Sequence, residues 1–245
     1  MVPPRDELYH MSRAPVCVVQ GRIMTRLTIA CLGDSMFDTM GEDCAPLREA
    51  LVEVRPDVEW TLRNHAVSGT RADYGLYRLS HDYQYKECPG KSVAYDDPDI
   101  VLVESFAYNH IIDRAEGLDH YRAVMTAIVD TIRRYTRARI MMVRTIPPDH
   151  DHFLEDVRDF YTLPPANRRA WATVVDLYMG TLKEWAGEAG LPLADAYGAC
   201  QVQLARGGSH RLFVDPADNI HPNGYGHRFV ARCIARALVD AGLID

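Results

Sequence analysis

Five short runs of apolar and β-branched residues divide this chain and predict strands. The run at 99–103 does not alternate between apolar and polar side chains, which is typical of a strand buried on both faces of a parallel sheet. The five predicted strands lie at residues 28–32, 58–67, 99–103, 140–143 and 191–195.

Between and after these runs, apolar side chains recur every three or four residues, as they do on the buried face of a helix. These stripes predict helices over residues 46–54, 118–135, 171–185 and 225–238. Strands that alternate with helices form a mostly parallel sheet with helices on both of its faces. The sequence therefore predicts an α/β fold around a central sheet of mostly parallel strands, five in number.

The length and composition of the chain fit one domain. Its 245 residues, 47% of them hydrophobic and 25% charged, suffice for one large α/β domain and are few for two. We place this domain at residues 25–245. Residues 1–24 are expected to form an N-terminal extension, because prolines at positions 3, 4 and 15 break any helix there. Met24 would serve equally well as an initiation point.

Charge and hydropathy exclude some classes of partner. The net charge is -7 and no block of lysine or arginine is present, so nucleic acid is not an expected partner. No run approaches the ~18 apolar residues that a membrane span needs, and residues 1–25 lack the apolar core of a secretion signal. We expect a cytoplasmic protein without a membrane span. Its oligomeric state is left open.

Neither the cysteines nor the histidines form a clear metal site. The six cysteines include no Cys-x-x-Cys pair, which favours free thiols. The segment Asp149–His152 contains ligand types for zinc or manganese, but adjacent residues of a loop seldom converge on one ion. A solvated acidic loop is the favoured interpretation, and a metal site is the alternative. No cofactor or metal is expected.

Two segments far apart in the chain supply the groups for nucleophilic catalysis. Gly33, Asp34 and Ser35 follow the first predicted strand, and Asp218 and His221 lie near the C-terminus. A serine hydroxyl needs a histidine to take its proton and a carboxylate to orient that histidine. Ser35 follows the carboxyl end of a strand, where open α/β sheets bind ligands, and Gly33 allows a sharp exit. The alternative role for Ser35 is to cap the following helix.

Candidate donors for an oxyanion follow the next two strands. Gly69 offers a backbone N–H without a side chain to block the substrate, and Asn109 offers its side-chain amide. The backbone N–H of Ser35 completes the set, because acyl transfer requires donors aimed at the charge that develops on the carbonyl oxygen. Alternatively, Gly69 only supplies a positive φ, and Asn109 is an ordinary turn residue.

Taken together, these segments resemble the four sequence blocks of the SGNH hydrolase superfamily, the GDSL-type lipases and esterases. The similarity spans nearly the whole chain after residue 25. It implies a three-layer α/β/α sandwich of the flavodoxin-like type. It also implies that Ser35 is the nucleophile, His221 the general base and Asp218 the partner that orients the histidine. Ser35, Gly69 and Asn109 would form the oxyanion hole.

One block departs from the family pattern, and one residue offers an alternative to it. Where the family usually has Gly-x-Asn-Asp in its third block, this chain has Ala107, Tyr108, Asn109 and His110. Asp215, six residues before His221, is an alternative to Asp218 as the orienting carboxylate.

The resemblance implies a serine ester hydrolase that forms an acyl-enzyme on Ser35 and cleaves carboxylic or acetyl esters of small molecules or carbohydrates. The same residues would serve an acyltransferase or a thioesterase. A non-catalytic module that binds a glycan or a partner, and a metal phosphoesterase, are the alternatives from other classes. The irregular stretch from Pro147 to Pro165 is long for a connection between a strand and a helix and is a candidate lid or wall of the site.

Overall fold

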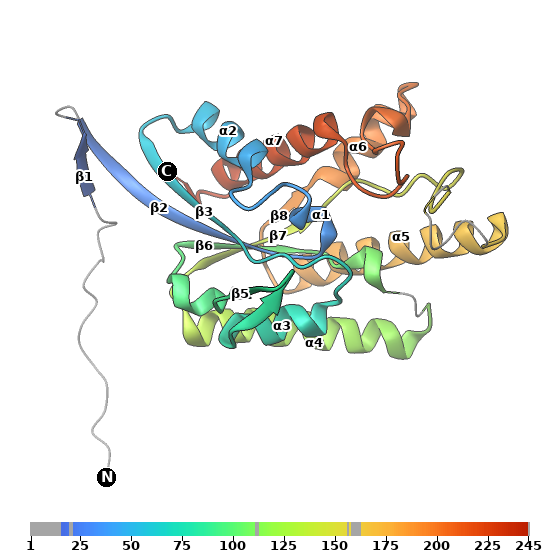
Figure 1. Cartoon of the computed structure of the whole chain (residues 1–245), viewed down its shortest axis with the longest axis horizontal. Helices are drawn as coiled ribbons and strands as arrows, with labels where there is room; N and C mark the ends of the chain where they lie inside the picture. The colour runs from blue at the N-terminus through green and yellow to red at the C-terminus, as the bar shows by residue number, and fades with distance from the viewer. Residues whose placement is uncertain (1–15, 20–21, 111–112, 156, 158–162, 245) are drawn as a thin grey trace, which may run out of the picture.

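The computed structural model describes residues 16–19, 22–110, 113–155, 157 and 163–244, and all structural statements concern these residues. A six-stranded sheet runs through the centre of the molecule (Figure 1). Five of its strands are parallel, in the order β3-β2-β6-β7-β8, and β1 pairs antiparallel with the start of β2. The strands are β1 (Val16–Val19), β2 (Arg22–Leu32), β3 (Val58–Asn64), β6 (Ile100–Glu104), β7 (Arg139–Arg144) and β8 (Leu193–Asp195).

Helices cover both faces of this sheet, as Figure 1 shows. One layer contains α2 (Ala45–Val54), α6 (Ala196–Ala205) and α7 (Gly224–Asp240); the other contains α3 (Ala72–Ser80), α4 (Ala115–Tyr135) and α5 (Pro165–Glu188). The α/β class and the five parallel strands are therefore confirmed. All four predicted helices are present, although α5 begins six residues before the predicted start at residue 171.

The sequence did not predict several smaller elements. These are the strand β1, the one-turn helix α1 (Ser35–Asp38), the helices α3 and α6, and the hairpin formed by β4 (Tyr83–Tyr85) and β5 (Cys88–Gly90). Through β1, strand pairing begins ahead of residue 25. Residues 1–15 and 20–21 of the expected extension lie outside the described residues, and the domain boundary at residue 25 stays a prediction.

The central strands are buried on both faces, which explains their continuous apolar sequence. Every side chain of β6 is buried, and Ile29–Leu32 of β2 lie beside it in the sheet. Gly33, directly after β2, is needed for this close packing, because a Cβ atom there would lie 2.8 Å from Cβ of Glu104. Its φ is not positive. The glycine thus permits close approach of two strand ends, and not a left-handed turn.

The parallel arrangement brings the carboxyl ends of β2, β3 and β6 to one edge of the sheet. Ser35 follows β2, Gly69 follows β3 and Asn109 follows β6. Residues that are far apart in sequence therefore meet at this edge, as expected for the ligand-binding side of an open α/β sheet.

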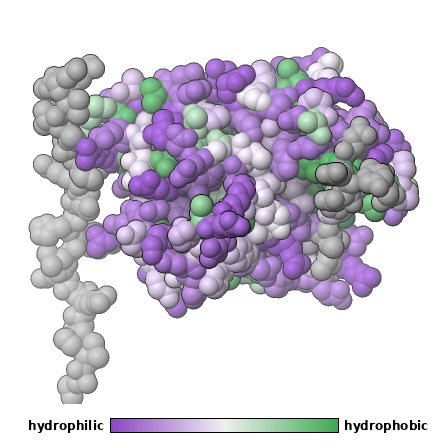
Figure 2. All heavy atoms as spheres, in the orientation of Figure 1, coloured by the Kyte–Doolittle hydropathy of each residue, from purple (hydrophilic) through white to green (hydrophobic). Residues whose placement is uncertain are grey.

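The face seen in Figure 2 is mostly hydrophilic, with hydrophobic residues in separate groups. No helix in the described ranges is both long enough and apolar enough to cross a membrane.

Candidate active site

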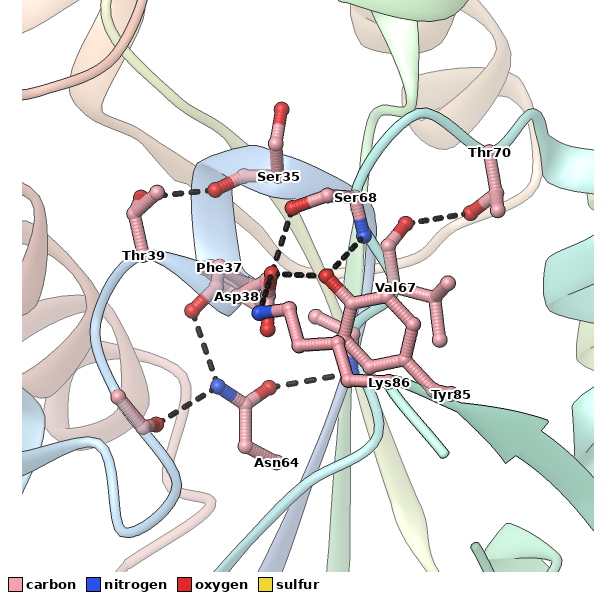
Figure 3. A network of polar contacts seen from close by, with 12 residues as sticks. Ser35, Phe37, Asp38, Thr39, Asn64, Val67, Ser68, Thr70, Tyr85 and Lys86 are labelled. Carbon is pink, nitrogen blue, oxygen red and sulfur yellow. Dashed lines mark hydrogen bonds and ion pairs between the residues drawn. The ribbon is translucent and has the colours of Figure 1, made fainter. Parts of the chain in front are cut away.

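Ser35 is the first residue of α1 and lies in a tight connection between β2 and that helix. Asp34 caps the helix, since its carboxylate accepts a hydrogen bond of 2.9 Å from the N–H of Met36. Ser35 itself is buried, with 7% of its surface exposed. Its hydroxyl points away from the polar network around Asp38 (Figure 3). The helix-capping role therefore belongs to Asp34, and the Ser35 hydroxyl is left for another task.

The second segment places a carboxylate against a histidine ring. His221 Nδ1 lies 2.6 Å from Oδ2 of Asp218, while Oδ1 of Asp218 accepts hydrogen bonds from the N–H groups of Ile220 and His221. Asn219, between them, has a φ of 58°, a left-handed conformation that costs energy in a residue other than glycine. Its side chain donates to the carbonyl of Glu155 and ties this turn to the stretch before α5. The carboxylate thus fixes the ring through Nδ1 and leaves Nε2 for chemistry.

The contact between Asp218 and His221 favours an ionised carboxylate and makes the imidazole ring more basic. Burial acts to lower the pKa of His221, but the hydrogen bond and the charge of Asp218 outweigh it, so the pKa is raised above its ordinary value. Burial acts to raise the pKa of Asp218, yet its hydrogen bonds with His221 and Ile220 hold that pKa below the usual range.

Asp215, the alternative orienting residue, has a different role. Its N–H donates to the carbonyl of His221, and its carboxylate accepts the N–H of Ala217. Its charge acts on the His221 ring less strongly than that of Asp218 does. Asp215 shapes the turn, whereas Asp218 contacts the ring.

One cavity of about 230 Å³ brings the sequence-predicted residues together. Ser35, Gly69, Asn109 and His221 all line it, with Asp218 behind His221. The other lining residues are mostly apolar: Ser68, Tyr108, Phe153, Leu154, Trp171 and Ile220.

Two of these apolar residues belong to the stretch from Pro147 to Pro165. Phe153 and Leu154 are 2% and 3% exposed and form part of the cavity wall. Their apolar character, in a loop otherwise rich in aspartate and histidine, is the signal that could have indicated a buried contact. The described part of the stretch is therefore a wall of the site.

Several polar groups in the cavity are free to act on a ligand. The described residues provide no hydrogen-bond partner for Ser35 Oγ, His221 Nε2 or the N–H groups of Ser35 and Gly69. A hydroxyl, a ring nitrogen and two backbone donors at one cavity can together bind and attack a carbonyl group.

Asp38 holds the turn that contains Gly69 (Figure 3). Its Oδ2 accepts hydrogen bonds of 2.5 Å from the hydroxyls of Ser68 and Tyr85, and the ammonium group of Lys86 lies 3.2 Å away. Gly69 follows with a φ of +73°, and a Cβ atom there would meet nothing within 4 Å. The glycine is therefore required by backbone conformation, and the turn is fixed to the helix that begins with Ser35.

Asn109 lies on the opposite side of the Ser35 turn. Its amide nitrogen donates a hydrogen bond of 2.7 Å to Oδ2 of Asp34. No other described residue accepts from this amide, so within the described part of the chain its second hydrogen is available to a ligand. Phe106, at the start of this segment, has a φ of 54°. The altered third block thus keeps the Asn109 side chain at the cavity, held by Asp34.

A second buried carboxyl group lies beneath this contact. Burial, followed by the charge of Asp34, raises the pKa of Glu104 well above its ordinary value. Burial also raises the pKa of Asp34, although hydrogen bonds from Met36 and Asn109 oppose the shift. The two neighbouring carboxyl groups therefore both have raised pKa values, with burial as the main cause.

The acidic segment Asp149–His152 forms pairs with its surroundings. His150 Nε2 lies 2.6 Å from Asp176, and His152 Nδ1 lies 3.2 Å from Asp149. Within the described ranges, no three His, Cys, Asp or Glu side chains are grouped so that they could hold a metal ion.

The overall structure is similar to several solved hydrolases. A catalytic mutant of Axe2, an acetylxylan esterase from Geobacillus stearothermophilus, gives a TM-score of 0.61 at 16% identity, covering 86% of this chain and 94% of that one. A putative GDSL-like lipase from Parabacteroides merdae gives a TM-score of 0.64 at 13% identity, covering 89% of this chain and 96% of that one. LAE5, an alpha/beta hydrolase enzyme from the metagenome of Lake Arreo, gives 0.59 at 19% identity, covering 86% and 94%. These similarities show the fold.

A comparison with curated proteins gave no significant match. The model of the GDSL-like Lipase/Acylhydrolase family, by contrast, matches residues 31–229 and so contains both the Ser35 turn and the Asp218–His221 segment. The chain belongs to the GDSL-like lipase/acylhydrolase family and is a hydrolase of ester bonds.

Proposed function

We propose that this protein hydrolyses esters through an acyl-enzyme on Ser35. The observation that carries the proposal is the shared cavity of Ser35, Gly69, Asn109 and His221, with Asp218 bound to the far nitrogen of His221. In this account, Ser35 Oγ attacks the ester carbonyl while His221 Nε2 takes its proton. His221 then returns the proton to the departing alcohol, and water attacks the acyl-enzyme in the same way.

Asp218 acts through His221. Its carboxylate accepts the Nδ1–H hydrogen bond, which leaves the lone pair of the neutral ring on Nε2. When Nε2 takes the serine proton, the ring becomes a cation, and the nearby carboxylate stabilises it.

The tetrahedral intermediate carries a negative oxygen that requires donors. We assign three donors to it: the N–H groups of Ser35 and Gly69, which have no partner among the described residues, and the second amide hydrogen of Asn109. Asp34 supports this assignment, because it holds one amide hydrogen of Asn109 and so fixes the direction of the other.

Replacing Asn109 by alanine is expected to lower kcat by about 10² to 10³, the usual effect of losing one oxyanion donor. Steady-state kinetics on a nitrophenyl ester measure this loss. Asn64→Ala is the matched control, since the Asn64 amide donates to the carbonyls of Phe37 and Gly41 and does not line the cavity. An Asn109→Ala enzyme with the activity of the Asn64→Ala control would contradict the assignment.

The size and walls of the cavity favour a short, uncharged acyl group. Its volume of about 230 Å³ is below the roughly 300–1,000 Å³ of pockets that hold a whole drug-sized ligand. Tyr108, Phe153, Leu154 and Trp171 give it apolar walls without a charged side chain. An acetyl or similarly short acyl group on a small alcohol fits these limits. The acetylxylan esterase among the similar structures makes acetylated carbohydrates the first class to test.

Hydrolysis of nitrophenyl acetate, butyrate, octanoate and dodecanoate tests this proposal. We expect kcat/KM to be highest for the short esters and to fall by at least about tenfold at dodecanoate, because the additional methylenes have no apolar surface to bury in so small a cavity. Highest activity on dodecanoate would contradict the short-acyl assignment. No activity on any ester, in a protein shown to be folded, would favour the non-catalytic binding module.

A further inference from the structure

Arg78, in the last turn of α3, is a buried cation beside the candidate site. It has no exposed surface and is among the largest fully buried side chains. No carboxylate of the described residues forms an ion pair with it, and its Nε has no hydrogen-bond partner. Burying a charge without an opposite charge is costly. The free-energy cost of burying this cation must therefore be offset by a benefit to the protein.

The guanidinium group connects two turns of the site. One terminal nitrogen donates a hydrogen bond of 2.8 Å to the carbonyl of Gly33, two residues before Ser35. The other donates to the hydroxyl of Thr70, directly after Gly69, at 3.2 Å. The Thr70 hydroxyl donates in turn to the carbonyl of Val67 (Figure 3). Arg78 therefore bridges the turn that carries the serine and the turn that carries Gly69.

The surroundings of Arg78 keep it charged. The rings of Tyr74 and Tyr83 lie 4.9 and 5.8 Å from its central carbon, within the range of cation–π attraction. Burial lowers the pKa of Arg78 to about 10, with the two tyrosines and Asp34 acting in the opposite direction. The group is thus a cation at neutral pH, and its charge is little screened by water.

We infer that Arg78 is a positioning residue of the oxyanion hole, whose two hydrogen bonds fix the N–H groups of Ser35 and Gly69 and whose positive charge favours the anionic tetrahedral intermediate. This role rests on the proposed acyl-enzyme mechanism. Donors that are fixed before the reaction stabilise developing charge without the cost of reorganisation.

A boronic acid inhibitor tests the inference, because it forms a tetrahedral, anionic adduct with an active serine. We expect Arg78→Met to lower kcat by about 10²-fold and to raise the inhibition constant of the boronic acid by a similar factor, while KM changes by less than about threefold. Arg78→Lys keeps the charge but cannot bridge both turns. It should therefore lower kcat, and raise the inhibition constant of the boronic acid, by about tenfold each. A role in stability alone would not weaken binding of the adduct selectively.

Arg144→Met is the matched control. Arg144 is also buried, at 4% exposure, but it pairs with Asp195 at 2.8 Å and does not line the cavity. This control should lose thermal stability and keep the wild-type inhibition constant.

Each outcome of this experiment decides the inference. Arg78→Met with kcat and the inhibition constant within threefold of wild type would overturn it. If Arg78→Met does not fold, the test of the inference rests on Arg78→Lys. A fully active Arg78→Lys enzyme would overturn the bridging role. If the boronic acid fails to inhibit the wild type through Ser35, as judged against Ser35→Ala, the proposed function fails and this inference with it.

Discussion

Replacing Ser35 by alanine is expected to lower kcat by on the order of 10⁴ to 10⁶. Without the hydroxyl, no acyl-enzyme can form, and only binding and the oxyanion donors remain to assist direct attack by water. The substitution removes one oxygen atom from a residue whose side chain has no hydrogen-bond partner among the described residues, so folding should change little. Steady-state kinetics on nitrophenyl acetate, with thermal unfolding to verify the fold, measure both effects.

Ser80→Ala is the matched control for this substitution. Ser80 lies at the end of α3, where its hydroxyl contacts His81 and not the cavity, so its loss should leave kcat unchanged. Activity of Ser35→Ala within about tenfold of wild type would contradict the role of Ser35, because removing a nucleophile costs far more than that.

Replacing His221 by alanine is expected to cost a similar factor, on the order of 10⁴ to 10⁶ in kcat. The two losses should not add in the double variant, since serine and histidine act as one unit. Steady-state kinetics of the two single variants and the double variant show whether the losses in kcat multiply. A double variant that is slower than wild type by the full product of the two single losses would contradict a shared step.

The pH dependence of kcat/KM gives an independent test of the role of His221. A general base must be neutral, so activity is lost as pH falls through the pKa of the ring. Because Asp218 raises that pKa above 6.5, the acid limb of the wild type should lie above pH 6.5. In Asp218→Asn the negative charge beside His221 is gone while the burial of the ring remains, so the acid limb of the kcat/KM profile should move to lower pH. Asp215→Asn, the matched control, should shift this acid limb much less.

The fold and the central part of the site could be predicted because local patterns determine them. Runs of apolar residues without alternation predict buried parallel strands, and the ends of such strands meet at one edge of the sheet. The three-residue interval between Asp218 and His221 fits within one turn, where the carboxylate reaches the ring. Ser35, Gly69 and Asn109 each follow a strand, so their positions at the cavity follow from topology.

Other parts of the site depend on contacts that no local pattern encodes. Arg78 lies on a short helix, and its sequence gives no sign that the charge is buried beneath two distant turns. The hydrogen bond between Asn109 and Asp34 joins residues 75 positions apart. The hairpin that carries Tyr85 has Lys86 and Glu87 at its turn, both with positive φ, where Asn-Gly would be the usual signal.

The acyl-enzyme on Ser35 is tested most directly by reaction with a fluorophosphonate, read by intact mass and located by peptide mapping. The account predicts one adduct on wild-type protein, located on Ser35. The adduct should be absent from Ser35→Ala and should form far more slowly on His221→Ala. Folded wild-type protein that stays unlabelled, or an adduct on another residue, would contradict the account.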